Sequence, residues 1–147
     1  MTGARTIHEV VTARLGGNGS GIVEPVAIAR PWGTILRVLH NDVSAVGKRS
    51  PWSVHVLDVL PGQRLSLHRH SMRDEIFMIL SGAITVQIAD EHFSGAVHKW
   101  FVVPKDTFHR IEAGPGGGQV LELACGHYDQ EDIQRLMDDY GRLEWRA

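Results

Sequence analysis

The apolar residues of this chain fall mainly into short runs that are separated by turn-forming residues. From Pro31 onward the runs are rich in β-branched and aliphatic side chains, and Pro, Gly, Asn and Asp stand between them. Such runs are typical of β-strands, and their regular spacing is typical of a sandwich or barrel. The pattern therefore predicts an all-β domain with strands at residues 34–39, 53–60, 64–67, 75–80, 83–88, 100–103, 107–111 and 119–124.

Tight reversals are expected wherever Pro, Gly or Asp interrupts these runs, because these residues supply the backbone angles that turns need. The clearest turn signals lie at residues 61–62, 81–82, 89–90, 104–106 and 114–118. We expect a strand to end at each of them.

The apolar spacing changes near the end of the chain. Apolar residues at i, i+3, i+4 and i+7 follow Asp129, which can cap a helix, and precede Gly141, which can end one. The spacing predicts one C-terminal amphipathic helix that covers one end of the barrel with Ile133, Leu136, Met137 and Tyr140.

The glycine-rich stretch at residues 16–21 separates the start of the chain from the β-rich part. Such a stretch breaks regular structure. We therefore divide the chain into an N-terminal extension at residues 1–29 and one domain at residues 30–147.

Composition and charge narrow the classes of function. The 147 residues are 43% hydrophobic and 22% charged, which is typical of a folded globular domain. Fifteen basic and seventeen acidic side chains give a formal charge of -2. No positive field is available to attract nucleic acid or an anionic membrane surface, so neither is an expected partner.

A single cysteine, Cys125, excludes an internal disulfide, and the start of the chain does not resemble a secretory signal. The longest apolar stretches, such as residues 76–80, are too short to cross a bilayer as helices. We therefore expect a cytoplasmic protein that acts on a small molecule.

Histidine and carboxylate residues have the spacing of a metal site. His68 and His70 are two apart on a predicted strand, so their side chains point to the same face. Glu75 begins the next strand after a short connection, and His109 follows a turn later in the chain. Three imidazoles and one carboxylate suit one divalent ion of Fe, Mn, Co, Ni or Zn, with coordination positions open to a ligand.

Two segments resemble the motifs of the cupin superfamily. The first reads Gly62-x5-His68-x-His70-x4-Glu75-x6-Gly82, and the second reads Pro104-x-Asp106-x2-His109. The second motif departs from the usual pattern at Asp106, where a glycine is expected, and at Ala113, where an asparagine is expected. The resemblance implies a jelly-roll barrel of two antiparallel sheets, with the four proposed ligands in its interior.

A narrower resemblance extends from Arg30 to Arg142. It is carried by residues 30–33, 61–67, 73–75, 81–82, 109–110, 131–133 and 139–142, which are similar to the cupin domain of type II mannose-6-phosphate isomerases. The resemblance implies metal-dependent interconversion of mannose 6-phosphate and fructose 6-phosphate. That family usually carries glutamine, methionine and three histidines where this chain has residues 68–72, and His-Trp where it has Ile76-Phe77. The guanylyltransferase half that commonly precedes this domain is absent from the sequence, so we expect no sugar-nucleotide synthesis.

Three functions fit these residues. A sugar-phosphate isomerase needs an anion-binding group, for which Arg64 and Arg73 are the candidate catalytic residues. A polyketide cyclase or a dioxygenase needs a more apolar pocket, and Phe77, Met78 or Trp100 would line it. A noncatalytic metabolite-binding cupin needs no base, and the sequence does not single one out among Lys99, His98, His55 and His127. We also expect a homodimer, since a jelly roll leaves exposed strand edges and many cupins pair.

Overall fold

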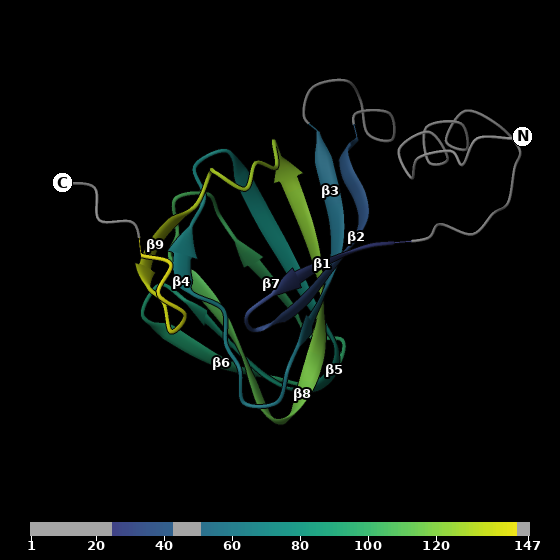
Figure 1. Cartoon of the computed structure of the whole chain (residues 1–147), viewed down its shortest axis with the longest axis vertical. Coiled ribbons are helices and arrows are strands. Elements are labelled where there is room, and N and C mark those ends of the chain that lie inside the picture. Colours follow the sequence, from purple (N-terminus) through teal and green to yellow (C-terminus); the bar gives the residue numbers. More distant parts are fainter. Residues whose placement is uncertain (1–24, 43–50, 144–147) are drawn as a thin grey trace, which may run out of the picture.

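The computed structural model describes residues 25–42 and 51–143, which form strands and turns without a helix (Figure 1). The strands of this described part are β1 Val26–Arg30, β2 Gly33–Asp42, β3 Trp52–Val59, β4 Leu67–Arg69, β5 Arg73–Ile88, β6 Glu91–Gly95, β7 Trp100–Val103, β8 His109–Gly126 and β9 Gln134–Met137. The pairings between these strands are antiparallel. The predicted all-β barrel class is confirmed.

The predicted N-terminal extension lies largely outside the described residues. Residues 1–24 are not described, whereas residues 26–29 belong to β1, which pairs with β2 as a hairpin. Within residues 25–42 and 51–143 no helix is long and apolar enough to cross a membrane.

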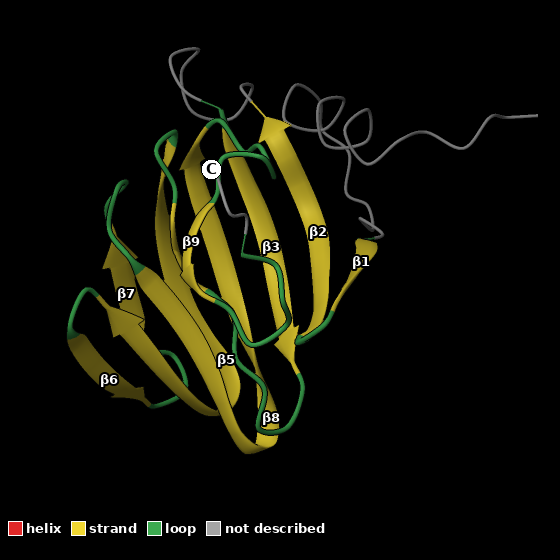
Figure 2. Ribbon diagram, turned by 60° about the vertical axis from the view of Figure 1, so that its left-hand side comes forward, coloured by secondary structure: helices red, strands yellow, loops and turns green. Residues whose placement is uncertain are grey.

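Two long strands organise the sheet. β8 pairs with β5 along most of its length and also with β3 and β4, while β5 continues the sheet to β6 and β7. Figure 2 shows β1, β2 and β3 at one edge and β6 and β7 at the other. Because β5 and β8 run through both halves, the two predicted sheets are joined into one curled sheet.

Two of the predicted turns lie inside these long strands. Gly82 pairs with Gly118 and Ile84 pairs with Ala113, so residues 114–117 form a bulge between these two pairs. A Cβ on Gly82 would lie 2.2 Å from the carbonyl oxygen of Gly117, and Gly82 has a φ of 82°, so this crossing requires glycine. The glycines bend the strands here instead of ending them. The predicted strands at residues 75–80 and 83–88 are therefore both part of β5, and those at residues 107–111 and 119–124 belong to β8, which begins at His109.

The core lies inside the curl and is built mainly from residues that alternate inward along the strands, with Trp32 and Leu65 contributed by the connections between strands. These inward side chains are buried and apolar, as the period of two requires. They are Trp32, Ile35, Leu57, Val59, Leu65, Phe77, Ile79, Ile84, Val86, Phe101, Val103, Ile111, Ala113 and Val120.

The predicted C-terminal helix is wrong. Residues Gln134–Met137 form strand β9, which pairs with β4, and Leu136 and Met137 are largely exposed. The helical spacing covers only about two turns, which is too short to be stable without tertiary support. Strand β4 offers backbone hydrogen-bonding groups to this segment, and Tyr140 anchors its end by donating to Gln63 Oε1 at 2.8 Å.

Candidate metal centre

The sheet brings three histidines together at one end of the curl. His68 on β4 lies opposite His109 on β8, and His70 follows two residues after His68. The ring centroids of His68 and His109 are 4.5 Å apart, and those of His68 and His70 are 4.8 Å apart. One ligand atom from each of the three lies within 4.8 Å of the others, so together they could hold a metal ion.

Each of these imidazoles is oriented by a backbone carbonyl. The Nδ1 atoms of His68, His70 and His109 contact the carbonyl oxygens of Ser66, Asp132 and Thr107 at 2.8, 2.5 and 2.9 Å. A carbonyl oxygen can only accept, so Nδ1 carries the proton and the lone pair is left on Nε2. This outer contact is the one by which proteins orient metal-binding histidines.

Glu75 on β5 lies against the histidines and is 2% exposed. Its Oε2 is 2.9 Å from Nε2 of His109, yet the two atoms are not aligned for a hydrogen bond, and both are buried without a hydrogen-bond partner. A buried carboxylate oxygen and a buried imidazole nitrogen that lie close together without hydrogen-bond partners can both bind the same cation. The donor set therefore fits a divalent metal, although the role of Glu75 as fourth ligand stays a prediction.

The electrostatics favour the protonation states that bind a metal. Burial lowers the pKa of His68 well below its usual value, and the nearby His109 and His70 lower it further. Burial also lowers the pKa of His70. Burial opposes ionisation of Glu75, but the contacts with His70, His109 and Arg73 outweigh it and hold the pKa of this carboxyl well below its usual value.

His109 differs from the other two imidazoles. Burial opposes its protonation, but the contact with Glu75 and the charge of that carboxylate raise its pKa. Because only the neutral imidazole binds a metal, His109 is the histidine at which a proton competes most with the ion.

Arg73 is the one of the two predicted catalytic arginines that lies at this site. Its Nε donates to Glu75 Oε1 at 2.8 Å, its Nη2 is 2.9 Å from His70 Nε2, and its guanidinium carbon lies 4.2 Å from the centre of the Tyr128 ring. The side chain is buried, so this cation balances the charge of Glu75 where water does not reach.

Arg64 lies elsewhere. On the surface, its Nε donates to Asp139 Oδ2 at 2.6 Å, and its guanidinium lies 3.7 Å from the Glu112 carboxylate. Arg64 does not line the pocket that contains Arg73. The structure thus brings Arg73 to the histidines and not Arg64.

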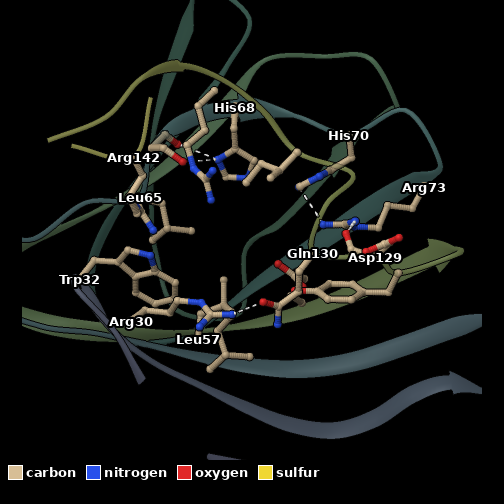
Figure 3. A pocket seen from close by; sticks show the side chains of 16 residues that line it. Arg30, Trp32, Leu57, Leu65, His68, His70, Arg73, Asp129, Gln130 and Arg142 are labelled. Carbon is tan, nitrogen blue, oxygen red and sulfur yellow. Dashed lines mark hydrogen bonds between the residues drawn. The ribbon is translucent and has the colours of Figure 1, made fainter. Parts of the chain in front are cut away.

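A pocket opens on His68, His70 and Arg73, and its volume is about 80 Å³. Figure 3 shows these residues on one side and Trp32, Leu57 and Arg30 across from them. Four arginines belong to its lining, namely Arg30, Arg73, Arg135 and Arg142. The apolar residues expected for a cyclase or oxygenase do not line it, because Phe77 is in the core and Met78 and Trp100 alternate to the outer face.

The sequence pattern did not predict several of the residues that line the pocket, among them Arg30, Glu122, Tyr128 and Arg135. They come from β1, β8, β9 and the segment before β9, so no spacing along the chain relates them. Of the four candidate bases, Lys99, His98 and His127 are exposed, while His55 is fully buried and contacts Glu122.

Comparison with known proteins identifies relatives of this chain. A family model described as "Mannose-6-phosphate isomerase C-terminal" matches residues 22–139. An alginate biosynthesis protein, AlgA of Pseudomonas aeruginosa, is 33% identical over 118 residues, which are 78% of this chain and 23% of that protein. A mannose-1-phosphate guanylyltransferase of Sinorhizobium fredii is 30% identical over 115 residues, which are 76% of this chain and 21% of that protein. The chain spans less than a quarter of the length of these curated relatives.

Solved structures share the fold at low sequence identity. KdgF from a Halomonas species has a TM-score of 0.61 at 20% identity and covers 72% of this chain and 92% of its own. The Streptomyces nucleoside dehydratase Pac13 has a TM-score of 0.64 at 11% identity, covering 82% and 92%. A cupin-2 domain of Rhodospirillum rubrum has a TM-score of 0.54 at 17% identity, covering 73% and 76%.

The family match includes every strand of the described part and all three histidines of the cluster. At these identities the solved structures show the fold alone, and that fold is the cupin barrel. The chain therefore belongs to the mannose-6-phosphate isomerase C-terminal family of cupins.

Proposed function

We propose that this chain is a metal-dependent isomerase that interconverts the aldose and ketose forms of a phosphorylated sugar. The observation that carries the proposal is the pocket, which is lined by four arginines together with His68 and His70 of the histidine cluster. A guanidinium binds phosphate through paired hydrogen bonds, whereas an apolar substrate has no charged acceptor for these bonds. The relatives with mannose phosphate in their names agree with this substrate class.

The metal would be held by His68, His70, His109 and Glu75. When bound, a divalent ion supplies positive charge that polarises a carbonyl group. The chain's own part is to orient these imidazoles through the carbonyls of Ser66, Asp132 and Thr107, while burial favours the neutral forms of His68 and His70.

The arginines divide into two groups by exposure. Arg73 is buried and already donates to Glu75, so its first task is to hold that carboxylate in place. Arg30, Arg135 and Arg142 are half-buried and line the pocket, where Arg30 donates to Gln130 Oε1 at 2.8 Å and Arg142 to Asp138 Oδ1 at 2.6 Å. We assign the phosphate to this second group.

The size of the cavity limits how the sugar is held. Its volume of about 80 Å³ is well below the roughly 300–1,000 Å³ of most small-molecule sites. We therefore expect the carbonyl end of the sugar to enter the cavity and the phosphate to stay at the rim, among the half-buried arginines.

The test combines metal analysis with binding and turnover. Protein loaded with Zn²⁺ or Mn²⁺ should bind mannose 6-phosphate at least about 10-fold more tightly than mannose, and Arg142→Gln should reduce that preference. Conversion of mannose 6-phosphate to fructose 6-phosphate should depend on the added ion. Equal affinity for the two sugars, or turnover unaffected by a chelator, would contradict the proposal.

The cyclase and dioxygenase alternatives find less support in this pocket. An oxygenase would need a redox-active ion and would consume oxygen, whereas carbonyl polarisation also works with Zn²⁺. Oxygen uptake coupled to substrate loss, with Zn²⁺ unable to restore turnover, would favour the oxygenase over the isomerase.

A further inference from the structure

A second polar pair lies in the wall of the same pocket, apart from the metal cluster. His55 on β3 and Glu122 on β8 are direct partners in the sheet register, and His55 Nδ1 lies 2.8 Å from Glu122 Oε1. His55 is 0% exposed and Glu122 is 7% exposed. Glu122 lines the pocket, whereas His55 lies behind it.

Glu122 is the pocket carboxylate best placed to exchange a proton. The described lining contains two carboxylates, Glu122 and Asp129. Asp129 is exposed and accepts a hydrogen bond from the backbone of Glu131, so it belongs to a surface turn. The other nearby carboxylates, Glu75 and Asp132, do not line the pocket.

The remaining bases at the site are committed elsewhere. His68 and His70 donate from Nδ1 to backbone carbonyls and present Nε2 to the metal position. Arg73 and Tyr128 connect this cluster to Glu122, since Arg73 contacts both His70 and Tyr128, and the Tyr128 ring lies 4.5 Å from that of His55.

We propose that Glu122 is the catalytic residue that moves the substrate proton in the isomerisation, and that His55 is the positioning residue that holds its carboxylate. The inference rests on the proposed isomerase function. The carboxylate removes the proton from C2, and the electron pair of the broken C–H bond forms the double bond of an enediol. The carboxyl then delivers a proton to C1, either the one removed from C2 or one that has exchanged with solvent, while O1 gains a proton and O2 loses one, so no oxidant or reductant is needed.

The burial of His55 supports its positioning role. Its Nε2 is buried without a hydrogen-bond partner, which costs free energy that the fold must offset. Its Nδ1 contacts only Oε1 of the Glu122 carboxylate, and Glu122 itself lines the pocket. A carboxylate fixed in this way stays in one rotamer, as proton transfer over a short distance requires.

The experiment measures proton transfer and binding separately. Zn²⁺-loaded or Mn²⁺-loaded protein is incubated with mannose 6-phosphate in D₂O, and deuterium at C2 is followed by NMR. Binding of mannitol 6-phosphate, which lacks a carbonyl and cannot react, is measured by calorimetry together with the metal content. Glu122→Gln should slow exchange by at least about 100-fold, while the affinity for mannitol 6-phosphate and the metal content change by less than about 3-fold.

Matched variants separate the chemical role from a structural one. Glu91→Gln, on the exposed strand β6, should leave exchange, binding and metal content unchanged. His55→Ala should lower kcat for exchange about 10-fold with little change in KM, and His55→Asn, which keeps a donor near the position of Nδ1, should recover most of that loss.

The outcomes distinguish this inference from the proposed function. Wild-type exchange with an equally active Glu122→Gln would overturn the role of Glu122 and leave the isomerase standing. Equal losses of exchange and of mannitol 6-phosphate binding would make Glu122 a binding group and also contradict the inference. Absence of exchange and turnover in the metal-loaded wild type would defeat both proposals. If Glu122→Gln is unfolded by circular dichroism, Glu122→Asp replaces it, and undiminished exchange in that variant would contradict the inference.

Discussion

At the scale of single residues, the proposed ligands are prepared for a metal by contacts that lie outside the metal position. Ser66, Asp132 and Thr107 accept the Nδ1 protons of the three histidines, so all three Nε2 atoms carry lone pairs. The sequence motif identifies the imidazoles, but these carbonyls come from three separate backbone positions. Their contribution is visible only in the fold.

Replacement of His70 by alanine should remove one ligand without removing core packing. We expect His70→Ala to weaken Zn²⁺ binding by at least about 100-fold, beyond the roughly 10–100-fold effect of losing an outer contact. The β-sheet signal in circular dichroism should be retained. His92→Ala, at an exposed position on β6, is the control and should keep full metal content by elemental analysis. Equal metal content in both variants would contradict the assigned site.

Acid should destabilise the metal-free protein through Glu75. The folded state holds the pKa of Glu75 well below its usual value of 4.5, so near and below that value the unfolded state binds more protons. The stability from Glu75 is therefore present above pH 4.5 and is lost as the pH falls toward the lower folded pKa.

The variant Glu75→Gln tests this dependence. At pH 7 it should be less stable than the wild type by about 3–5 kcal/mol, because the buried Arg73 loses its nearest carboxylate and keeps only Asp132 at 3.8 Å. The difference should shrink between pH 5 and pH 3 in urea unfolding experiments. A constant difference over this range would show that Glu75 is not responsible, and exposed Glu91→Gln should show almost no difference at any pH.

At the scale of elements, the segment that precedes β9 supports the histidine cluster. The Asp132 carboxylate accepts hydrogen bonds from Ser71 N at 3.0 Å, Ser71 Oγ at 2.6 Å and Met72 N at 2.9 Å. These three bonds hold the connection between β4 and β5 in place. They also hold the pKa of Asp132 below its usual value against the effect of burial.

Asp132→Ala should therefore affect both stability and metal binding. We expect a loss of about 1–3 kcal/mol in the free energy of unfolding and a metal affinity weaker by about 10-fold or more. Asp139→Ala removes a surface ion pair with Arg64 and should leave the free energy of unfolding almost unchanged, with metal affinity unchanged. Similar metal affinities in the two variants would count against a supporting role of this segment.

At the scale of the whole molecule, the outer face of the sheet carries two rows of apolar side chains. The register aligns one row across β7, β5, β8 and β3 as Trp100, Met78, Leu121 and Val56, and the other as Val102, Ile76, Leu123 and Val54. Trp100 is 53% exposed and Val102 is 62% exposed. Contiguous apolar patches are uncommon on monomers, and strands that are apolar on both faces are typical of sheets covered on both sides.

We expect a second copy of the chain to cover this face as a homodimer, since an apolar sheet face is complementary to itself under two-fold symmetry. Val102→Glu should shift the protein to a monomer in sedimentation equilibrium at micromolar concentration. Val26→Glu, an exposed apolar position on β1, should not. A monomeric wild type would refute this prediction.

The sequence by itself determined the strand class, most strand positions and the four residues proposed as metal ligands. These follow from local rules, because a period of two defines a strand face and a short stretch of chain across β4 and β5 contains His68, His70 and Glu75. Where the prediction was wrong, a nonlocal contact decided. Pairing with β4 made the C-terminal segment a strand, and the close approach of Gly82 to Gly117 turned predicted strand ends into bends.

Only the tertiary structure decided which side chains share the pocket. Arg30, Glu122 and Arg142 are far apart along the chain and meet at one cavity because the sheet curls, while Arg64 pairs with Asp139 on the surface instead. The same register sets His55 behind Glu122. The reason is physical: local spacing specifies which face of a strand a residue occupies, but pairing and curvature specify what that face encounters.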